Sequence, residues 1–102
     1  MTMTTHPRKL VVIITESALE NALSRELIAL GAHGYTISDV RGRGSRGSRE
    51  AVWEADRNIR FEVICDETVA GTIASAMREK YYDDYAMTLF VADIGVLRPE
   101  KF

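Results

Sequence analysis

The chain has 102 residues, 46% of them hydrophobic, so it is long enough for one compact domain and too short for two. Its formal net charge of -2 argues against attraction of the whole molecule to nucleic acid. Cys65 is the single cysteine, which excludes an internal disulfide and a cysteine-only metal site. The longest apolar run is too short to span a bilayer, and residues 1–8 lack the apolar core of a signal peptide, so we expect a cytoplasmic protein.

The first half of the chain predicts a strand followed by a helix. Residues 1–8 are polar, with Pro7 blocking regular structure, and are expected to form a flexible tail. Residues 9–15 are rich in β-branched side chains, which predicts a strand buried on both faces and hence central in its sheet. Ser17 begins a capping-box pattern, and the helix is expected to end at Gly31 with a left-handed C-cap. The apolar face of this helix comprises Leu19, Ala22, Leu23, Leu27 and Leu30.

The second half repeats this layout after a long connection. Residues 35–41 predict a second strand, and residues 58–65 alternate apolar and polar side chains as a third strand does. Between them, residues 42–57 are rich in glycine and arginine and are expected to form a long loop, which in small domains is usually functional or disordered. Asp66 is a suitable N-cap for a second helix, and residues 87–96 predict a fourth strand. The buried stripe of the second helix comprises Val69, Ile73, Ala76 and Met77.

The order strand–helix–strand therefore occurs twice, which is typical of the α+β, ferredoxin-like βαββαβ fold. We expect this domain over residues 9–98, between the flexible tail of residues 1–8 and a C-terminal tail of residues 99–102. Both helices would cover one face of the sheet, and no third helix is available for the other face. An apolar sheet face without a cover predicts that the domain forms oligomers.

The loop after the second predicted strand carries the strongest chemical signal. Residues 42–47 read Gly-Arg-Gly-Ser-Arg-Gly, in which successive backbone N–H groups can converge on an anion because no Cβ blocks the approach. Arginine adds forked donors that match phosphate or carboxylate oxygens. The loop is neither a P-loop, because the Gly-Lys-Ser/Thr ending is missing, nor the opening of a helix. A flexible basic linker is the alternative interpretation of this composition.

Other polar residues carry weaker signals. Asp83 and Asp84 could hold a metal or act as an acid–base pair, or they could form a solvated turn. The turn is the commoner role of adjacent aspartates. His6 and His33 have no partner at a metal-ligand spacing, so no metal is expected. Trp53 either closes over a ligand or packs locally. A nucleic-acid-binding module is the alternative function, although no aromatic residues interleave with its basic patch. That patch comprises Arg41, Arg43, Arg46 and Arg49.

Residues 34–44 resemble the G-x-T-x-x-x-V-x-G-x-G segment that leads into the T-loop of PII signalling proteins. Further shared segments are the K-L-V-I-x-T start, G-x-G-S-R-G, N-I-x-F-E-V, K-Y-x-D-D-Y and the closing L-R-x-x-K-F. Together they cover about nine-tenths of the chain, from Lys9 to Arg98 and beyond. The resemblance is to the inorganic-carbon branch of the family, which includes a carboxysome-associated PII protein and a regulator of a sodium-dependent bicarbonate transporter.

This resemblance implies a homotrimer that binds adenine nucleotides in the clefts between subunits. Arg46 and Arg98 match positions that reach phosphate, residues 62–64 match a strand edge near the adenine, and Phe90 would come from the last strand. It further implies regulation of inorganic carbon uptake, or of carboxysome-related CO2 fixation, through the T-loop of about residues 42–57. The expected nucleotide-binding residues are Thr36, Gly42, Arg43, Gly44, Ser45, Arg46, Gly47, Glu62, Val63, Ile64, Phe90 and Arg98.

Departures from the family pattern reduce the number of candidate ligands. Standard PII proteins carry a T-G-x-x-G-D-G-K loop, whereas residues 81–86 here contain neither glycine nor lysine. ADP, AMP or cyclic AMP is therefore expected rather than Mg-ATP with 2-oxoglutarate, and bicarbonate is a candidate second ligand. The T-loop lacks the tyrosine used for uridylylation, and the C-G-P-x-G-C tail linked to diphosphatase activity is missing, so we expect no enzyme activity. The expected protein partner is a bicarbonate transporter or another carbon-uptake protein, to which the chain would attach peripherally.

Overall fold

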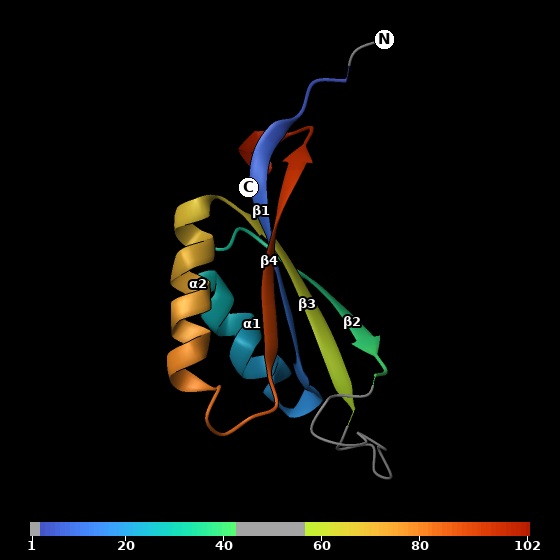
Figure 1. Ribbon diagram of the computed structural model, residues 1–102, viewed down its shortest axis with the longest axis vertical. Helices are drawn as coiled ribbons and strands as arrows, with labels where there is room; N and C mark the ends of the chain where they lie inside the picture. The colour runs from blue at the N-terminus through green and yellow to red at the C-terminus, as the bar shows by residue number, and fades with distance from the viewer. Residues whose placement is uncertain (1–2, 43–56) are drawn as a thin grey trace.

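The computed structural model describes residues 3–42 and 57–102, which form an antiparallel sheet with two helices packed on one face (Figure 1). In this part of the chain the strand order is β2-β3-β1-β4, and every pair is antiparallel. The α+β, ferredoxin-like arrangement expected from the sequence is confirmed. The elements are β1 (His6–Glu16), the 3-10 turn η1 (Ser17–Leu19), α1 (Glu20–Ala29), β2 (Thr36–Val40), β3 (Asn58–Cys65), α2 (Glu67–Lys80), β4 (Thr88–Val96) and the 3-10 turn η3 (Pro99–Lys101).

Strand β1 is central, as its uninterrupted β-branched run predicts, because it pairs with both β3 and β4. It begins earlier than expected, since His6 already pairs with Val96 of β4. Residues 6–8 are therefore strand and not flexible tail. Pro7 is tolerated here because the pairing of β1 with β3 starts only at Lys9, so the ring lies where the strand has one neighbour.

The core lies between the two helices and one face of the sheet. Successive side chains of a strand point to opposite faces, so β1 and β3 each contribute every second residue to it. Residues at the helical spacing complete the core from the other layer, as the sequence pattern predicts. Its fully buried members include Val11 and Ile13 of β1, Phe61 and Val63 of β3, Leu23 and Leu27 of α1, and Ile73 and Met77 of α2.

The helix ends show where local signals succeed and where one fails. Asp66 caps α2 as expected, its Oδ1 accepting a hydrogen bond from the N–H of Val69 at 2.8 Å. Gly31 has a φ of 113°, the left-handed conformation expected after α1. The predicted capping box at Ser17 is wrong, because a 3-10 turn precedes α1 and no side chain caps either element. The backbone N–H of Ser17 instead donates to Arg57 O at 2.7 Å.

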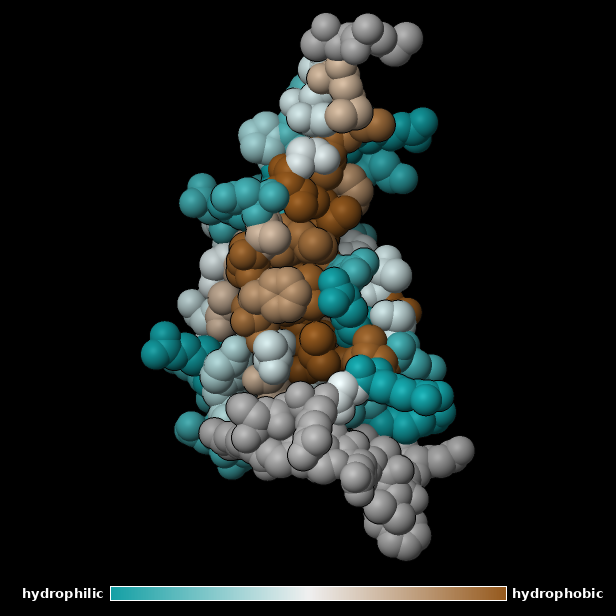
Figure 2. Space-filling view, turned by 45° about the vertical axis from the view of Figure 1, so that its right-hand side comes forward, coloured by the Kyte–Doolittle hydropathy of each residue, from teal (hydrophilic) through white to brown (hydrophobic). Residues whose placement is uncertain are grey.

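The face of the sheet turned away from the helices is apolar along β1 and β4. Figure 2 shows this side of the molecule, with a hydrophobic band that runs along its middle. Phe90 of β4 lies opposite Val12 of β1 and is 45% exposed, whereas Val12 is fully covered by its neighbours. We call these six positions the open face; they are Leu10, Val12 and Ile14 of β1, and Phe90, Ala92 and Ile94 of β4.

A hydrogen-bonded cluster ties the two helices together. The Tyr81 hydroxyl donates to Glu26 Oε1 at 2.7 Å, and the Lys80 ammonium pairs with the other oxygen of the same carboxylate. Burial alone would raise the pKa of Glu26, but the hydrogen bonds from Lys80 and Tyr81 lower it overall. Burial and the bond to Glu26 raise the pKa of Tyr81 to about 12. The carboxylate of Glu26 therefore favours the folded state only while it is ionised.

Replacing Tyr81 with phenylalanine is expected to lower the free energy of unfolding at pH 7 by about 1.5 kcal/mol, because a hydrogen bond to a charged acceptor is lost. The pKa of Glu26 is lower in the folded chain, so its contribution is present above the unfolded pKa and disappears as the pH falls through the folded pKa. The difference between wild type and Tyr81→Phe should therefore shrink in acid. Urea unfolding of both proteins between pH 7 and pH 3 measures this difference in free energy. A difference that stays constant over this pH range would contradict a hydrogen bond from Tyr81 to an ionised Glu26.

Candidate functional site

A hollow of about 220 Å³ lies where β2 begins and β3 ends. The structure brings together three of the expected nucleotide-binding residues there, namely Thr36, Glu62 and Ile64. The antiparallel register places Thr36 directly opposite Glu62, and Ile64 follows two residues later on the same face of β3. The remaining lining residues come from the turn after α1 and from the end of the described chain; they are His33, Gly34, Tyr35, Lys101 and Phe102.

The hollow has apolar walls and two charged lining residues, Glu62 and Lys101. Tyr35 packs edge-on against Phe61 of the core, with ring centroids 5.6 Å apart, so its ring is held in place. The Glu62 carboxylate is already paired with Arg60, whose Nε lies 3.0 Å from Glu62 Oε2. Lys101 has no ion pair with another residue in the described ranges. The hollow is thus suited to a flat apolar group that carries negative charge.

Val63 belongs to the expected strand edge through its backbone and not through its side chain. Its side chain points to the opposite face of β3 from Glu62 and Ile64 and is fully buried in the core. Its side chain cannot meet a ligand in the hollow, so only its backbone remains available. The pairing of β2 with β3 ends at Thr36 and Glu62, which leaves the last residues of β3 without a β2 neighbour on that side. An open strand edge of this kind offers backbone N–H and C=O groups.

Other expected site residues lie outside this hollow. Phe90 is on the open face, with the Arg60 guanidinium 6.0 Å from its ring centroid. Arg98 is exposed and does not line the hollow; its carbonyl accepts the backbone N–H of Lys101 at 3.2 Å. Gly42 follows β2, at the opposite end of that strand from Thr36, about 20 Å away at the rise of an extended chain. The expected contributions of Arg43, Gly44, Ser45, Arg46 and Gly47, and of Trp53, lie outside the described residues.

The hollow also contains residues to which the sequence analysis assigned no binding role. The sequence gives His33 no partner at a metal-ligand spacing and predicts Lys101 and Phe102 to lie in a C-terminal tail. The nearest signal was the L-R-x-x-K-F segment, which is shared with the family but gives no indication of what its lysine faces. These residues come from segments far apart in the chain, and only the folded structure brings them together.

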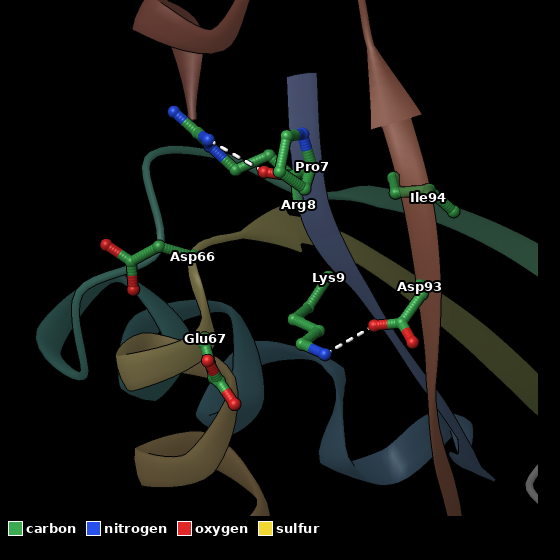
Figure 3. Close-up of a pocket in the computed structure, with 7 residues that line it drawn as sticks. All are labelled: Pro7, Arg8, Lys9, Asp66, Glu67, Asp93 and Ile94. Carbon is green, nitrogen blue, oxygen red and sulfur yellow. Dashed lines mark hydrogen bonds and ion pairs between the residues drawn. The ribbon is translucent and has the colours of Figure 1, made fainter. Parts of the chain in front are cut away.

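A second hollow, of about 270 Å³, lies beside the first turn of α2 (Figure 3). Several of its charged groups already have partners within the protein. Lys9 pairs with Asp93, and this hydrogen bond raises the pKa of Lys9. Asp66 is engaged in capping α2, and Arg8 donates hydrogen bonds to two backbone carbonyls. The described residues contain no group of three or more side chains able to hold a metal ion.

The residues between α2 and β4 form a turn. The backbone N–H groups of Asp84 and Tyr85 both donate to Tyr81 O, at 3.2 and 2.9 Å. Asp83 and Asp84 are exposed, in agreement with the solvated-turn interpretation of this aspartate pair. No helix in the described part of the chain is long and apolar enough to cross a membrane.

Fold and hollow together define a small ferredoxin-like domain with a hollow at one end of its sheet. The chain belongs to the nitrogen regulatory protein P-II family, whose sequence profile matches residues 8–101. This confirms the resemblance to PII proteins and favours a signalling regulator over an enzyme or a nucleic-acid-binding module.

Solved structures agree with this assignment. A PII-like signaling protein from Thermus thermophilus is 45% identical, with a TM-score of 0.84 over 98% of this chain and 99% of that one. CPII from Thiomonas intermedia, solved with ADP and bicarbonate bound, is 29% identical, with a TM-score of 0.86 over 99% of both chains. GlnK from B. subtilis, in complex with ATP, is 18% identical with a TM-score of 0.67 over 98% of this chain and 100% of that one, and shares the fold. The similarity to CPII identifies the chain as a PII-like protein of the carbon-associated branch.

Proposed function

We propose that this chain is a PII-like signal-transduction protein that binds ADP or AMP in clefts between identical subunits. Bicarbonate is the proposed second ligand, and the proposed output is regulation of inorganic carbon uptake or of carboxysome-related CO2 fixation through residues 42–57. The observation that carries the proposal is the hollow at the β2–β3 end. It joins Thr36, Glu62 and Ile64 to apolar walls and a lysine without an ion pair to a described residue.

Strand β2 separates the expected binding residues into two groups. Thr36 lies at its start and Gly42 just beyond its end, about 20 Å apart along an extended chain. A nucleotide whose base lies beside Thr36 would therefore need its phosphates to extend along the whole of β2 to reach Gly42 of the same subunit. One subunit would therefore supply the hollow and a neighbour would supply the glycine–arginine loop. This arrangement supports a site between subunits.

The open face supports the assembly that such a site requires. No helix formed by residues 3–42 or 57–102 lies over its apolar side chains, and Phe90 at its centre is 45% exposed. Apolar surface gathered in this way is stabilised by burial against another protein surface, and identical copies are the simplest partner. We propose a trimer in which the open faces of three chains pack around a common axis.

The proposed ligand follows from the chemistry of the hollow. The adenine would lie between Tyr35 and Ile64, beside the open edge of β3. The phosphates would extend toward the cationic groups, among which we include Arg98 and, from residues 42–47 of a neighbouring subunit, Arg43 and Arg46. CPII has been solved with ADP, AMP and bicarbonate bound, which supports the same ligands here. Cyclic AMP is a further candidate because it carries the same base.

The proposed mechanism is a population shift in the loop of residues 42–57. A nucleotide changes the loop only to the extent that it binds one loop state better than another, so ADP and AMP would favour different states through their phosphate number. The favoured state would then be recognised by a carbon-uptake protein such as a bicarbonate transporter. If bicarbonate binds beside the phosphates, nucleotide and bicarbonate must raise each other's affinity by the same factor.

A bulky side chain in the hollow tests the site. Thr36→Trp is expected to weaken ADP binding by about tenfold or more, because the indole would occupy the space proposed for the base. Ser38→Trp is the matched control, since Ser38 is exposed on the same face of β2 but does not line the hollow. Calorimetric titration with ADP, AMP and cyclic AMP, each with and without bicarbonate, measures the effect. Equal affinities in the two variants would remove the hollow from the site.

A further inference from the structure

The end of the sheet opposite the hollow carries an acidic side chain in a row of four residues. Asn58 of β3 pairs with Val40 of β2 on one side and with Glu16 of β1 on the other. The register of β1 with β4, continued by two residues, places Ala86 on the far side of Glu16. These four residues therefore form a row across the end of the sheet, and among them only Glu16 is charged.

The Glu16 carboxylate is held against the turn that leads into β4. Its Oε1 accepts a hydrogen bond from the backbone N–H of Ala86 at 3.3 Å. Backbone N–H groups at turns are donors that an anion can use, and here a carboxylate already uses one. Glu16 is half-buried and has no ion pair with another residue in the described ranges. Its negative charge thus lies beside a turn that would otherwise offer a donor to an anion.

Arginines at the same end of the sheet attract phosphate. Arg41 and Gly42 follow β2, and Arg57 precedes β3. Both arginines are exposed, and neither forms an ion pair with Glu16. In the proposed function, the phosphates of a nucleotide whose base lies in a neighbouring subunit reach this end beside Gly42. β3 separates β2 from β1, so Glu16 lies about two strand spacings, or roughly 10 Å, from the end of β2.

This separation makes the effect of Glu16 depend on the length of the phosphate chain. Repulsion between a carboxylate and a phosphate grows as they approach, and salt screens it beyond about 8 Å at physiological ionic strength. The first phosphates beside Gly42 would lie near the limit of this range. A third phosphate that extends across the row would enter the range and would find the N–H of Ala86 already bonded.

From this arrangement we propose that Glu16 is a specificity-determining residue that disfavours a third phosphate and so restricts the site to nucleotides with one or two phosphates. The inference rests on the proposed function, because it requires a nucleotide whose phosphates lie beside Gly42. The lack of glycine and lysine in residues 81–86 removes attraction for phosphate, and Glu16 adds repulsion.

The first experiment removes the charge and retains the hydrogen bond. Glu16→Gln is expected to raise the affinity for ATP about fivefold and to leave ADP and AMP within about twofold of wild type, because only the third phosphate comes close. The glutamine amide oxygen can still accept from the N–H of Ala86. Glu20→Gln is the control, since it removes the same charge from an exposed position at the start of α1. Calorimetric titration without magnesium gives the ATP-to-ADP affinity ratio, and an unchanged ratio in Glu16→Gln would overturn the role of Glu16.

The second experiment separates charge from shape. Glu16→Asp keeps the carboxylate on a shorter side chain, so its ATP-to-ADP ratio should stay within about twofold of wild type. Raising the salt concentration from about 0.05 M to about 0.5 M should reduce the difference between wild type and Glu16→Gln, because salt screens the charge. A difference that does not depend on salt would refute the charge mechanism.

The outcomes distinguish this inference from the proposed function. If wild type binds none of ATP, ADP and AMP, the proposed function itself fails. If wild type binds ADP, and ATP binds equally well to wild type and to Glu16→Gln, only the role of Glu16 is refuted.

Discussion

Replacing Phe90 with aspartate is expected to convert the assembled protein into folded monomers that no longer bind ADP at concentrations that saturate wild type. Phe90 is 45% exposed at the centre of the open face, so the single chain can accept a polar side chain there. In an assembly, the same position would place one carboxylate per subunit in an apolar interface, at a cost of several kcal/mol each. Arg60 offers limited compensation, because it is already paired with Glu62.

The adjacent residue provides a matched control. Val91 is 44% exposed and points to the opposite face of β4, so Val91→Asp introduces the same charge without altering the open face. Sedimentation velocity reports the oligomeric state, circular dichroism reports folding, and ADP titration reports the site. If Phe90→Asp stays assembled and still binds ADP, the open face is not the surface through which the subunits assemble.

Replacing Phe61 with alanine is expected to lower the free energy of unfolding by about 3–5 kcal/mol, a large part of the total stability of a domain this size. Phe61 is fully buried in β3 and lies beside Ile13 of β1 and Ile37 of β2 in the sheet register. Its removal leaves a cavity that the surrounding strands cannot close. It also removes the edge contact that holds Tyr35 at the hollow, so ADP binding should weaken as well.

Phe61→Leu separates the two effects. Leucine retains most of the buried volume, so its cost should stay below about 2 kcal/mol, but it lacks the ring that meets Tyr35. Urea unfolding at one fixed protein concentration measures stability, because assembly makes the midpoint depend on concentration. Titration with ADP then shows whether the aromatic contact matters for binding. If alanine costs no more than leucine, Phe61 is not the central packing residue that its burial indicates.

Local patterns predicted most of the elements. The β-branched run of β1, the alternation of β3 and the Asp66 cap of α2 were all found where the sequence placed them, because each depends on neighbours within a few residues. Errors arose where distant pairing overrides local preference. His6 extends β1 through its pairing with β4, and Ser17 is not the N-cap of α1 because the 3-10 turn η1 precedes that helix.

The residues of the candidate site also fall into those that motifs identify and those that only the folded structure brings to the hollow. Motifs sufficed to select Thr36, Glu62 and Ile64, since adjacent segments of two strands supply them. The alternation of residues 58–65 also places Val63 on the apolar face of β3 with Phe61, and the structure buries that face in the core. No local pattern shows that Lys101 reaches the hollow, because the side chains that contact its segment, Arg8 and His33, come from distant parts of the chain.

Amino-acid order alone was enough for the fold class, the central strand and the family, because periodicity and motifs are properties of short stretches. Long-range packing was needed to place Lys101, Phe102 and His33 around one hollow. The reason is physical: spacing along the chain determines which face a side chain takes, whereas the closure of long loops determines which faces meet.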